Sequence, residues 1–180
     1  GQLGDGTTTF RRPTPKLVAG GLSFVQVTAG DNHTCGITSD RKGYCWGGNL
    51  KGQLGDNTIN DKSKPHLVAA GLSYNTLVAA NQFTCGVTTG HVAYCWGSNT
   101  DGQLGDGTVL TRIKPTPVAG GLSFAGVDPG NLSTCAVTTG KRAYCWGFNG
   151  YGQVGNGSNT GPDTCRSNLP CARKPQAVGS

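Results

Sequence analysis

Cysteine has the clearest chemical potential in this chain, because its eight copies follow a regular pattern. Six of them form three pairs whose members lie ten residues apart, and the pairs recur every 50 residues: Cys35 and Cys45, Cys85 and Cys95, and Cys135 and Cys145. An even number of regularly spaced cysteines favours a disulfide framework in an oxidising compartment. Zinc is the rival interpretation, but this spacing differs from the CxxC pattern of zinc knuckles.

A hairpin would bring the members of each pair together. Directly opposite residues of an antiparallel pair have a constant index sum, so Cys35 opposite Cys45 centres the turn on Asp40. The equivalent centres are Gly90 and Gly140, and both residue types tolerate a left-handed turn position. Opposite Cβ atoms in a non-hydrogen-bonded pair lie about 4.5 Å apart, close to disulfide range. We therefore predict the disulfides Cys35–Cys45, Cys85–Cys95 and Cys135–Cys145.

The two irregular cysteines, Cys165 and Cys171, lie in an insertion. The segment between the GQ[LV]G string and the next Lys-Pro step is ten residues longer in the last repeat than in the one before it. We predict a Cys165–Cys171 disulfide that staples the inserted loop 159–172. Binding residues are often found on loops held by a rigid scaffold. The candidate contacts with a protein partner are Arg166, Leu169 and Arg173, and a tolerated insertion without a binding role is the equal alternative.

The remaining reactive side chains form no catalytic pattern. The three histidines occupy unrelated positions in their repeats, and the chain contains no glutamate: His33, His66 and His91. The sequence has no G-x-S-x-G elbow, phosphate-binding loop or paired carboxylates. A recurring aspartate of the repeat, at Asp5, Asp56 and Asp106, becomes Asn156 in the last copy, which favours a turn over a calcium site. We therefore expect a protein that is not an enzyme and holds no metal or cofactor.

The elements that position the cysteines belong to a repeated unit. The string AYCWGSNTDGQLGDGT at 93–108 recurs in similar form at 43–58 and 143–158, and a period of this size indicates a solenoid, propeller or array. The chain has 31 glycines and no methionine, which makes it poor helix material. Each unit contains four short strands divided by turn signals, including a proline-edged strand suited to a sheet edge. The fold class is all-β, with β-propeller blades of four antiparallel strands in about 3.5 repeats of 50 residues.

We interpret residues 1–180 as a single repeat array. The repeats run approximately over 1–51, 52–101 and 102–151, followed by a partial repeat at 152–180. One tryptophan per repeat follows the second cysteine and so faces the opposite side of the sheet. These tryptophans are expected to pack between neighbouring blades, with an aromatic ligand cage as a remote alternative: Trp46, Trp96 and Trp146.

The motif AG-x-x-HTC…YCWG-x-N-x-x-GQLGDGT resembles the regulator of chromosome condensation repeat, in the cysteine-bearing form common in bacterial extracellular proteins. The resemblance covers essentially the whole chain and implies a β-propeller, usually of seven blades. It does not fix a function, since relatives include a nuclear exchange factor for a small GTPase, a plant UV-B photoreceptor and a secreted β-lactamase inhibitor. The family's histidine before Thr-Cys is present only as His33, with Phe83 and Ser133 at the equivalent positions.

These features predict a secreted or cell-surface protein, with the periplasm as a further option, that acts as a protein-binding or assembly scaffold. The alternatives are a propeller-type inhibitor of a secreted enzyme and, by family analogy only, a regulator similar to a guanine-nucleotide exchange factor. The net charge of +6 is dispersed over hairpin tips and Lys-Pro steps, which indicates a solvated rim rather than a nucleic-acid surface. No apolar run approaches the roughly 20 residues of a membrane helix.

The first and last segments are the same part of the repeat, so the two ends cannot complete one ring. The array therefore belongs to a longer propeller, joins a second copy, or assembles head to tail. The expected partners are thus the rest of a propeller, copies of the same chain or another protein. Three N-x-[ST] sequons, at Asn32, Asn131 and Asn156, matter only in a eukaryotic source.

Overall fold

The computed structural model describes residues 1–9 and 11–179, and its strands form three antiparallel sheets. The first sheet contains β1 (Phe24–Ala29), β2 (His33–Thr38), β3 (Gly43–Gly47) and β4 (Lys62–Leu67). The second contains β5 (Tyr74–Ala79), β6 (Phe83–Thr88), β7 (Ala93–Gly97) and β8 (Arg112–Pro117). The third contains β9 (Phe124–Pro129), β10 (Ser133–Thr138), β11 (Ala143–Phe148), β12 (Asp163–Thr164) and β13 (Pro170–Ala177).

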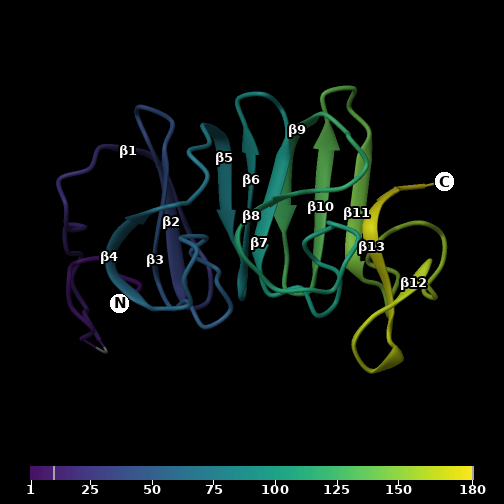
Figure 1. The fold of residues 1–180 in the computed structure, drawn as a ribbon, viewed down its shortest axis with the longest axis horizontal. Helices are drawn as coiled ribbons and strands as arrows, with labels where there is room; N and C mark the ends of the chain where they lie inside the picture. Colours follow the sequence, from purple (N-terminus) through teal and green to yellow (C-terminus); the bar gives the residue numbers. More distant parts are fainter. Residues whose placement is uncertain (10, 180) are drawn as a thin grey trace.

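The sheets lie side by side in chain order, as the blades of an open propeller do (Figure 1). Strands β1, β5 and β9 are the innermost, because each contacts the next across the blade boundary. Strands β4 and β8 are the outer edges of their sheets. The all-β fold and the four-stranded blade predicted from the sequence are confirmed for the first two sheets. The third sheet has a fifth strand, because the insertion supplies β12 beside β13.

Each blade crosses a boundary between sequence repeats. Three strands of the first blade precede residue 52, whereas its outer strand β4 follows that residue. The reason is the long loop after β3, whose GQLGD string packs against Trp96 of the next sheet before the chain returns along the edge of the first sheet. The proline-containing segments therefore form outer strands, as expected of residues that lack a backbone donor. The corresponding segment at 11–18 forms no strand, since no described strand is available to pair with it.

The cysteine hairpins have the register expected from the index sums. Cys35 pairs with Cys45, Cys85 with Cys95, and Cys135 with Cys145 across β2–β3, β6–β7 and β10–β11. The structure contains these three disulfides together with Cys165–Cys171.

The hairpin turns differ from the expectation in one respect. The left-handed residue is not Asp40, Gly90 or Gly140 but the residue after each of them. These residues have φ angles of +61° to +65°: Arg41, His91 and Lys141. The reason is that the tip begins with a tight turn, which the Arg41 N–H closes by donating to Thr38 O. Arg41, the last residue of this turn, then adopts the left-handed conformation that reverses the direction of the chain.

The core lies between the sheets rather than inside any one of them. One cluster joins the first and second sheets and includes Ile37, Leu77 and Trp96. The other joins the second and third sheets and includes Val87, Phe124 and Trp146. Because every sheet contributes apolar side chains to its neighbours, a blade of this kind is stable only when another blade covers it.

Candidate functional site

The tryptophans fix each blade to the loop that precedes it. Each indole Nε1 donates at 2.9 Å to a glutamine carbonyl oxygen: Trp46 to Gln2, Trp96 to Gln53, and Trp146 to Gln103. The same three carbonyls accept a threonine hydroxyl at 2.8 Å, from Thr34, Thr84 and Thr134 respectively. Two bonds thus converge on one carbonyl at each joint, each contributing about 1 kcal/mol.

A glycine two residues after each glutamine lets the indole approach. A Cβ atom on Gly4, Gly55 or Gly105 would lie 2.5 to 2.6 Å from the indole nitrogen. These glycines also have φ near +70°, which side chains rarely adopt. We term the glutamine carbonyl and this glycine an indole site.

The fourth indole site, made of Gln153 and Gly155, faces no tryptophan. All three tryptophans of the chain are described, and each donates to one of the other sites. Gly155 retains the conformation of its equivalents, with φ +68°, but the side chain nearest to its added Cβ is Val178 at 3.2 Å. Gln53 and Gln103 are buried, whereas Gln153 is exposed. The fourth site therefore has the shape of the others and a different environment.

The adjoining face of the third sheet is also apolar and uncovered. Val137 is 46% exposed, whereas its equivalents Ile37 and Val87 are 1% and 0% exposed under the inner strand of the next blade. The face contains a shallow depression of about 420 Å³, lined by Gly126, Val127, Asp128, Cys135, Ala136, Val137 and Ala143. We term this surface the open face of blade 3. At the opposite end of the array, the inner strand β1 is uncovered. Val27 is 57% exposed, whereas its equivalents Leu77 and Val127 are buried against the preceding blade.

Two aromatic residues precede the fourth indole site in the chain, and the Tyr151 N–H donates to Gln153 Oε1 at 2.9 Å. Phe148 and Tyr151 make an edge contact with ring centroids 5.9 Å apart. Tyr151 is 88% exposed, and its equivalent Lys51 is exposed as well, whereas Asp101 is buried beside Arg166 of the insertion. Exposed tyrosines of this kind are enriched in protein interfaces.

The stapled insertion folds back on the array. Its short 3₁₀ helix η1 (Arg166–Asn168) brings Arg166 to within 3.6 Å of the Asp101 carboxylate, which belongs to the preceding loop. Arg173 forms a 2.8 Å ion pair with Asp163 across the β12–β13 ladder. Leu169 is 38% exposed. The structure therefore places both arginines in contacts within the chain, while Leu169 and the outer part of Arg166 face solvent.

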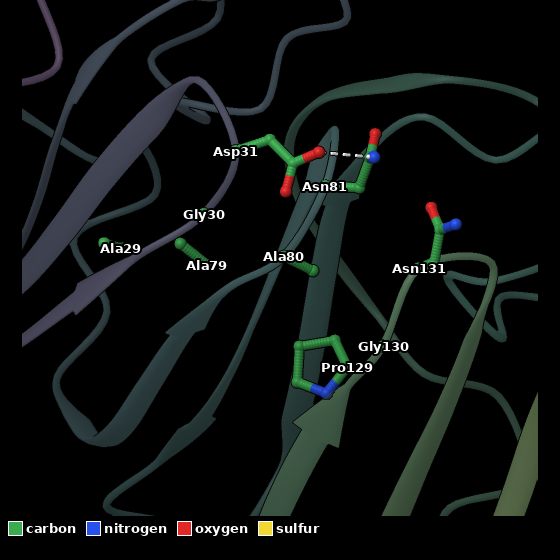
Figure 2. A pocket seen from close by; sticks show the side chains of 9 residues that line it. All are labelled: Ala29, Gly30, Asp31, Ala79, Ala80, Asn81, Pro129, Gly130 and Asn131. Carbon is green, nitrogen blue, oxygen red and sulfur yellow. Dashed lines mark hydrogen bonds between the residues drawn. The ribbon is translucent and has the colours of Figure 1, made fainter.

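A depression of about 490 Å³ lies where the inner-strand turns of the three blades converge (Figure 2). Its polar lining comes from three equivalent positions: Asp31, Asn81 and Asn131. Asn81 donates to Asp31 Oδ2 at 2.7 Å, and the Asn131 amide comes from the neighbouring turn. This pocket was not predicted from the sequence, although the 50-residue spacing of its three polar positions is a signal that could have revealed it.

His33 forms a polar joint between the first two blades. The Thr84 hydroxyl donates to Gln53 O, so it accepts from His33 Nε2–H at 2.8 Å. The remaining ring nitrogen, Nδ1, is buried without a partner among the described residues. Burial lowers the pKa of His33 to about 4. The neutral imidazole is therefore a structural link.

The recurring aspartates build turns. Asp106 accepts the Thr108 N–H and hydroxyl at 2.9 and 2.7 Å, and it pairs with Arg112 at 2.7 Å. Burial opposes ionisation of Asp106, but the bonds from Thr108 and Arg112 outweigh it and hold the pKa of the carboxyl below its usual value. Asp5 pairs likewise with Arg12, and Asp56 with Lys62. Among residues 1–9 and 11–179, no three His, Cys, Asp or Glu side chains group as metal ligands, and no helix could span a membrane.

Comparisons with known proteins match these features. Two family models of the regulator of chromosome condensation (RCC1) repeat match the chain, one at residues 1–37 and 90–137 and the other at 24–53 and 128–153. Over 64 residues the chain is 41% identical to the probable E3 ubiquitin-protein ligase HERC4 of Homo sapiens, and 39% identical to those of Rattus norvegicus and Mus musculus. That alignment covers 34% of this chain and 6% of each relative.

Solved structures show the same fold. Prp20p from Saccharomyces cerevisiae, described with its binding properties to Gsp1p and histones, superposes with a TM-score of 0.72 and 21% identity, over 87% of this chain and 38% of that one. Human WBSCR16 superposes with a TM-score of 0.75 and 19% identity, over 91% of this chain and 40% of that one. The chain thus spans a minor part of the relatives it matches.

Proposed function

Because the chain belongs to the regulator of chromosome condensation repeat family, with matches over residues 1–53 and 90–153, we propose that it is a non-catalytic protein-binding scaffold. Its four disulfides indicate an oxidising, non-cytosolic location. We place the scaffold at the cell surface or outside the cell. The protein-binding role is consistent with Prp20p, which is described as binding Gsp1p and histones.

One observation carries the proposal: the fourth indole site and the open face of blade 3 stand exposed in the geometry that the other copies bury. Inside the array, an equivalent face receives an aliphatic residue of the next inner strand, such as Leu77 at 0% exposure. The equivalent carbonyl receives an indole N–H. The partner that fits is therefore a β-blade that presents an aliphatic inner strand and a tryptophan.

A second intact copy is a poor occupant of the fourth indole site. Its first blade offers Trp46, but that indole already donates to Gln2 O and packs on Gly4. Residues 1–6 of the second copy would compete with residues 152–157 of the first for the same indole. A polypeptide of residues 1–180 should therefore stay monomeric at this face, and exposing Trp46 should let copies associate.

The substitution Gly4→Val tests this reasoning without shortening the chain. A Cβ at residue 4 would lie 2.5 Å from Trp46 Nε1, so valine displaces residues 1–6 from the indole. Sedimentation velocity should show concentration-dependent association of Gly4→Val but not of the parent chain. The matched control is Gly20→Val, since Gly20 has φ +100° but no neighbour within 4 Å. It introduces backbone strain without uncovering an indole.

A second substitution locates the contact. Adding Val137→Lys to Gly4→Val should abolish association, because a charge would then face the apolar inner strand. Val109→Lys, at a valine that is 39% exposed outside the open face, should leave association intact. The proposal is wrong if folded Gly4→Val stays monomeric, or if it associates equally with and without Val137→Lys.

A further inference from the structure

We propose that Asn156 is a site of spontaneous covalent modification, at which the neighbouring backbone amide displaces the side-chain amide. Asn156 and Gly157 form one of two Asn-Gly steps in the chain. Glycine lacks the Cβ that would hinder attack on the preceding side chain, and asparagine is among the thermolabile residues of proteins. The inference does not depend on the proposed function.

The reaction balances with water as its only co-reactant. The Gly157 backbone nitrogen loses its proton to base and forms a bond to Asn156 Cγ. The bond from Cγ to Nδ2 breaks, and Nδ2 leaves as ammonia. Water then opens the cyclic imide at either carbonyl, giving aspartate or isoaspartate. The net change is hydrolysis of an amide to a carboxylate, with no oxidation or reduction.

The attacking nitrogen is held in three copies of this turn and unheld in the fourth. At the equivalent positions the backbone N–H donates to an outer-strand carbonyl of the next sheet: Gly6 to Ser63, Asn57 to Ile113, and Gly107 to Arg173, at 2.8 to 3.0 Å. The described residues contain no sheet after the third, and among them Gly157 has no counterpart of this bond. Its surroundings are also open, since an added Cβ would meet nothing within 4 Å. The backbone movement that cyclisation needs is therefore least restrained at Gly157.

The side chain under attack is equally loose. Asp56 and Asp106 each accept a threonine hydroxyl and an asparagine amide in addition to a backbone N–H. Among the described residues, Asn156 accepts a single hydrogen bond, from Ser158 N–H at 3.2 Å. The Ser158 hydroxyl contacts Thr160 instead. Little of the fold therefore has to break before Cγ can be reached.

The product would be a carboxylate like its equivalents, but it would lack the cation that each of them has beside it. In the first two sheets that cation, Lys62 or Arg112, pairs with a glycine of the neighbouring strand. In the third sheet the corresponding glycine, Gly147, pairs with Ala172 instead. A carboxylate at residue 156 therefore has no such cation, and it lies next to Gly155 of the fourth indole site. If the proposed function holds, the modification changes the charge of the partner-binding surface.

The other Asn-Gly step supplies a matched control within the same loop. Asn149 is fully buried, donates through Nδ2 to Ser158 O at 2.9 Å and accepts the Val154 N–H at 2.9 Å. A Cβ on Gly150 would lie 2.5 Å from the Phe148 ring, so this backbone is covered. Folded protein should therefore protect Asn149 while exposing Asn156.

The test is peptide mapping by mass spectrometry after prolonged incubation of the unreduced chain in mildly alkaline buffer. The chain is produced in a bacterial host so that no glycan occupies the Asn156 sequon. We expect the mass gain of amide hydrolysis, together with isoaspartyl methyltransferase labelling, at Asn156 and not at Asn149. Reduced and denatured chain should convert at both positions, which shows that the fold causes the difference. Retention of both amides in the folded chain, or equal conversion at both, would overturn the proposal.

A substitution separates this chemistry from general damage. Asn156→Gln lengthens the side chain and disfavours the five-membered imide, so conversion at this position should fall to background. Ser158→Ala removes a hydroxyl that does not contact Asn156 and should leave conversion unchanged. Partner binding is not measured in either experiment, so failure of the scaffold proposal would not affect the outcome.

Discussion

Replacing His33 with phenylalanine should remove much of the acid sensitivity of the joint between the first two blades. Phenylalanine occupies the equivalent position at residue 83, where it is fully buried. The substitution keeps an aromatic ring in place and discards the titratable nitrogen. It also loses the bond from His33 Nε2–H to Thr84, but Thr84 still has Gln53 O to donate to.

The magnitude follows from linkage. Burial lowers the pKa of His33 from 6.5 to about 4, so below pH 6.5 the unfolded chain takes up a proton that the folded chain refuses. Stability from this residue is complete above pH 6.5 and is lost as pH falls toward 4. At about 1.4 kcal/mol per pKa unit, the difference amounts to about 3 kcal/mol. The acidic neighbour on the adjoining turn, Asp31, accepts a hydrogen bond from the Asn81 side-chain amide (Figure 2).

The assay is urea unfolding of the disulfide-intact chain at several pH values from 6.5 down to 4. The parent should lose about 3 kcal/mol more than His33→Phe over this interval. Aspartates with lowered pKa values, such as Asp106, lose their contribution in both proteins and cancel in the comparison. His91→Asn, at an exposed hairpin tip, is the control and should follow the parent. Equal acid losses in parent and His33→Phe would refute the reasoning.

Three further predictions concern stability. Lys141→Gly should raise the free energy of unfolding in urea by about 1 kcal/mol, because Lys141 has φ +61° and glycine adopts this conformation more readily than lysine. The neighbouring control Arg142→Gly should lower the free energy of unfolding. A lower free energy of unfolding for Lys141→Gly would contradict this reasoning. Asp106→Ala should lower the free energy of unfolding by about 2 kcal/mol or more, since it removes the hydrogen bonds to Thr108, Asn99 and Arg112. Asn156→Ala should lower it far less. Similar losses at the two positions in thermal unfolding would argue against the role of Asp106 in building its turn. Replacing Cys165 and Cys171 with serine should speed tryptic cleavage after Arg166 without altering the blades, and an unchanged cleavage rate would mean that the Asp101 contact alone holds the insertion.

Local signals in the sequence were enough to predict the blade. The cysteine register follows from the spacing of two residues in one hairpin, and proline marks the outer strands because it lacks a donor. The left-handed residue was expected at Asp40 and lies one position later, at Arg41, since an index sum locates a turn but does not distinguish turn types.

Features that join distant segments were beyond the sequence argument. The bond between His33 and Thr84 links residues 51 positions apart, and no local pattern distinguishes it from a solvated histidine. Arg166 was predicted as a candidate partner contact on an exposed loop, and its contact with Asp101 depends on how the insertion folds back. Whether Arg166, Leu169 or Arg173 also contacts a partner stays a prediction.

The crossing of blade and repeat boundaries governs how the array responds to tension. Strand β4 completes the first sheet, yet residues 68–73 tie it directly to β5 of the second. A force that draws the second sheet away must peel β4 from β3, while the Cys35–Cys45 bond keeps β2 and β3 together. Under load, the outer strands would detach first and the cross-linked hairpins would persist. The array would then lengthen by releasing short segments, with its disulfide-bonded hairpins intact.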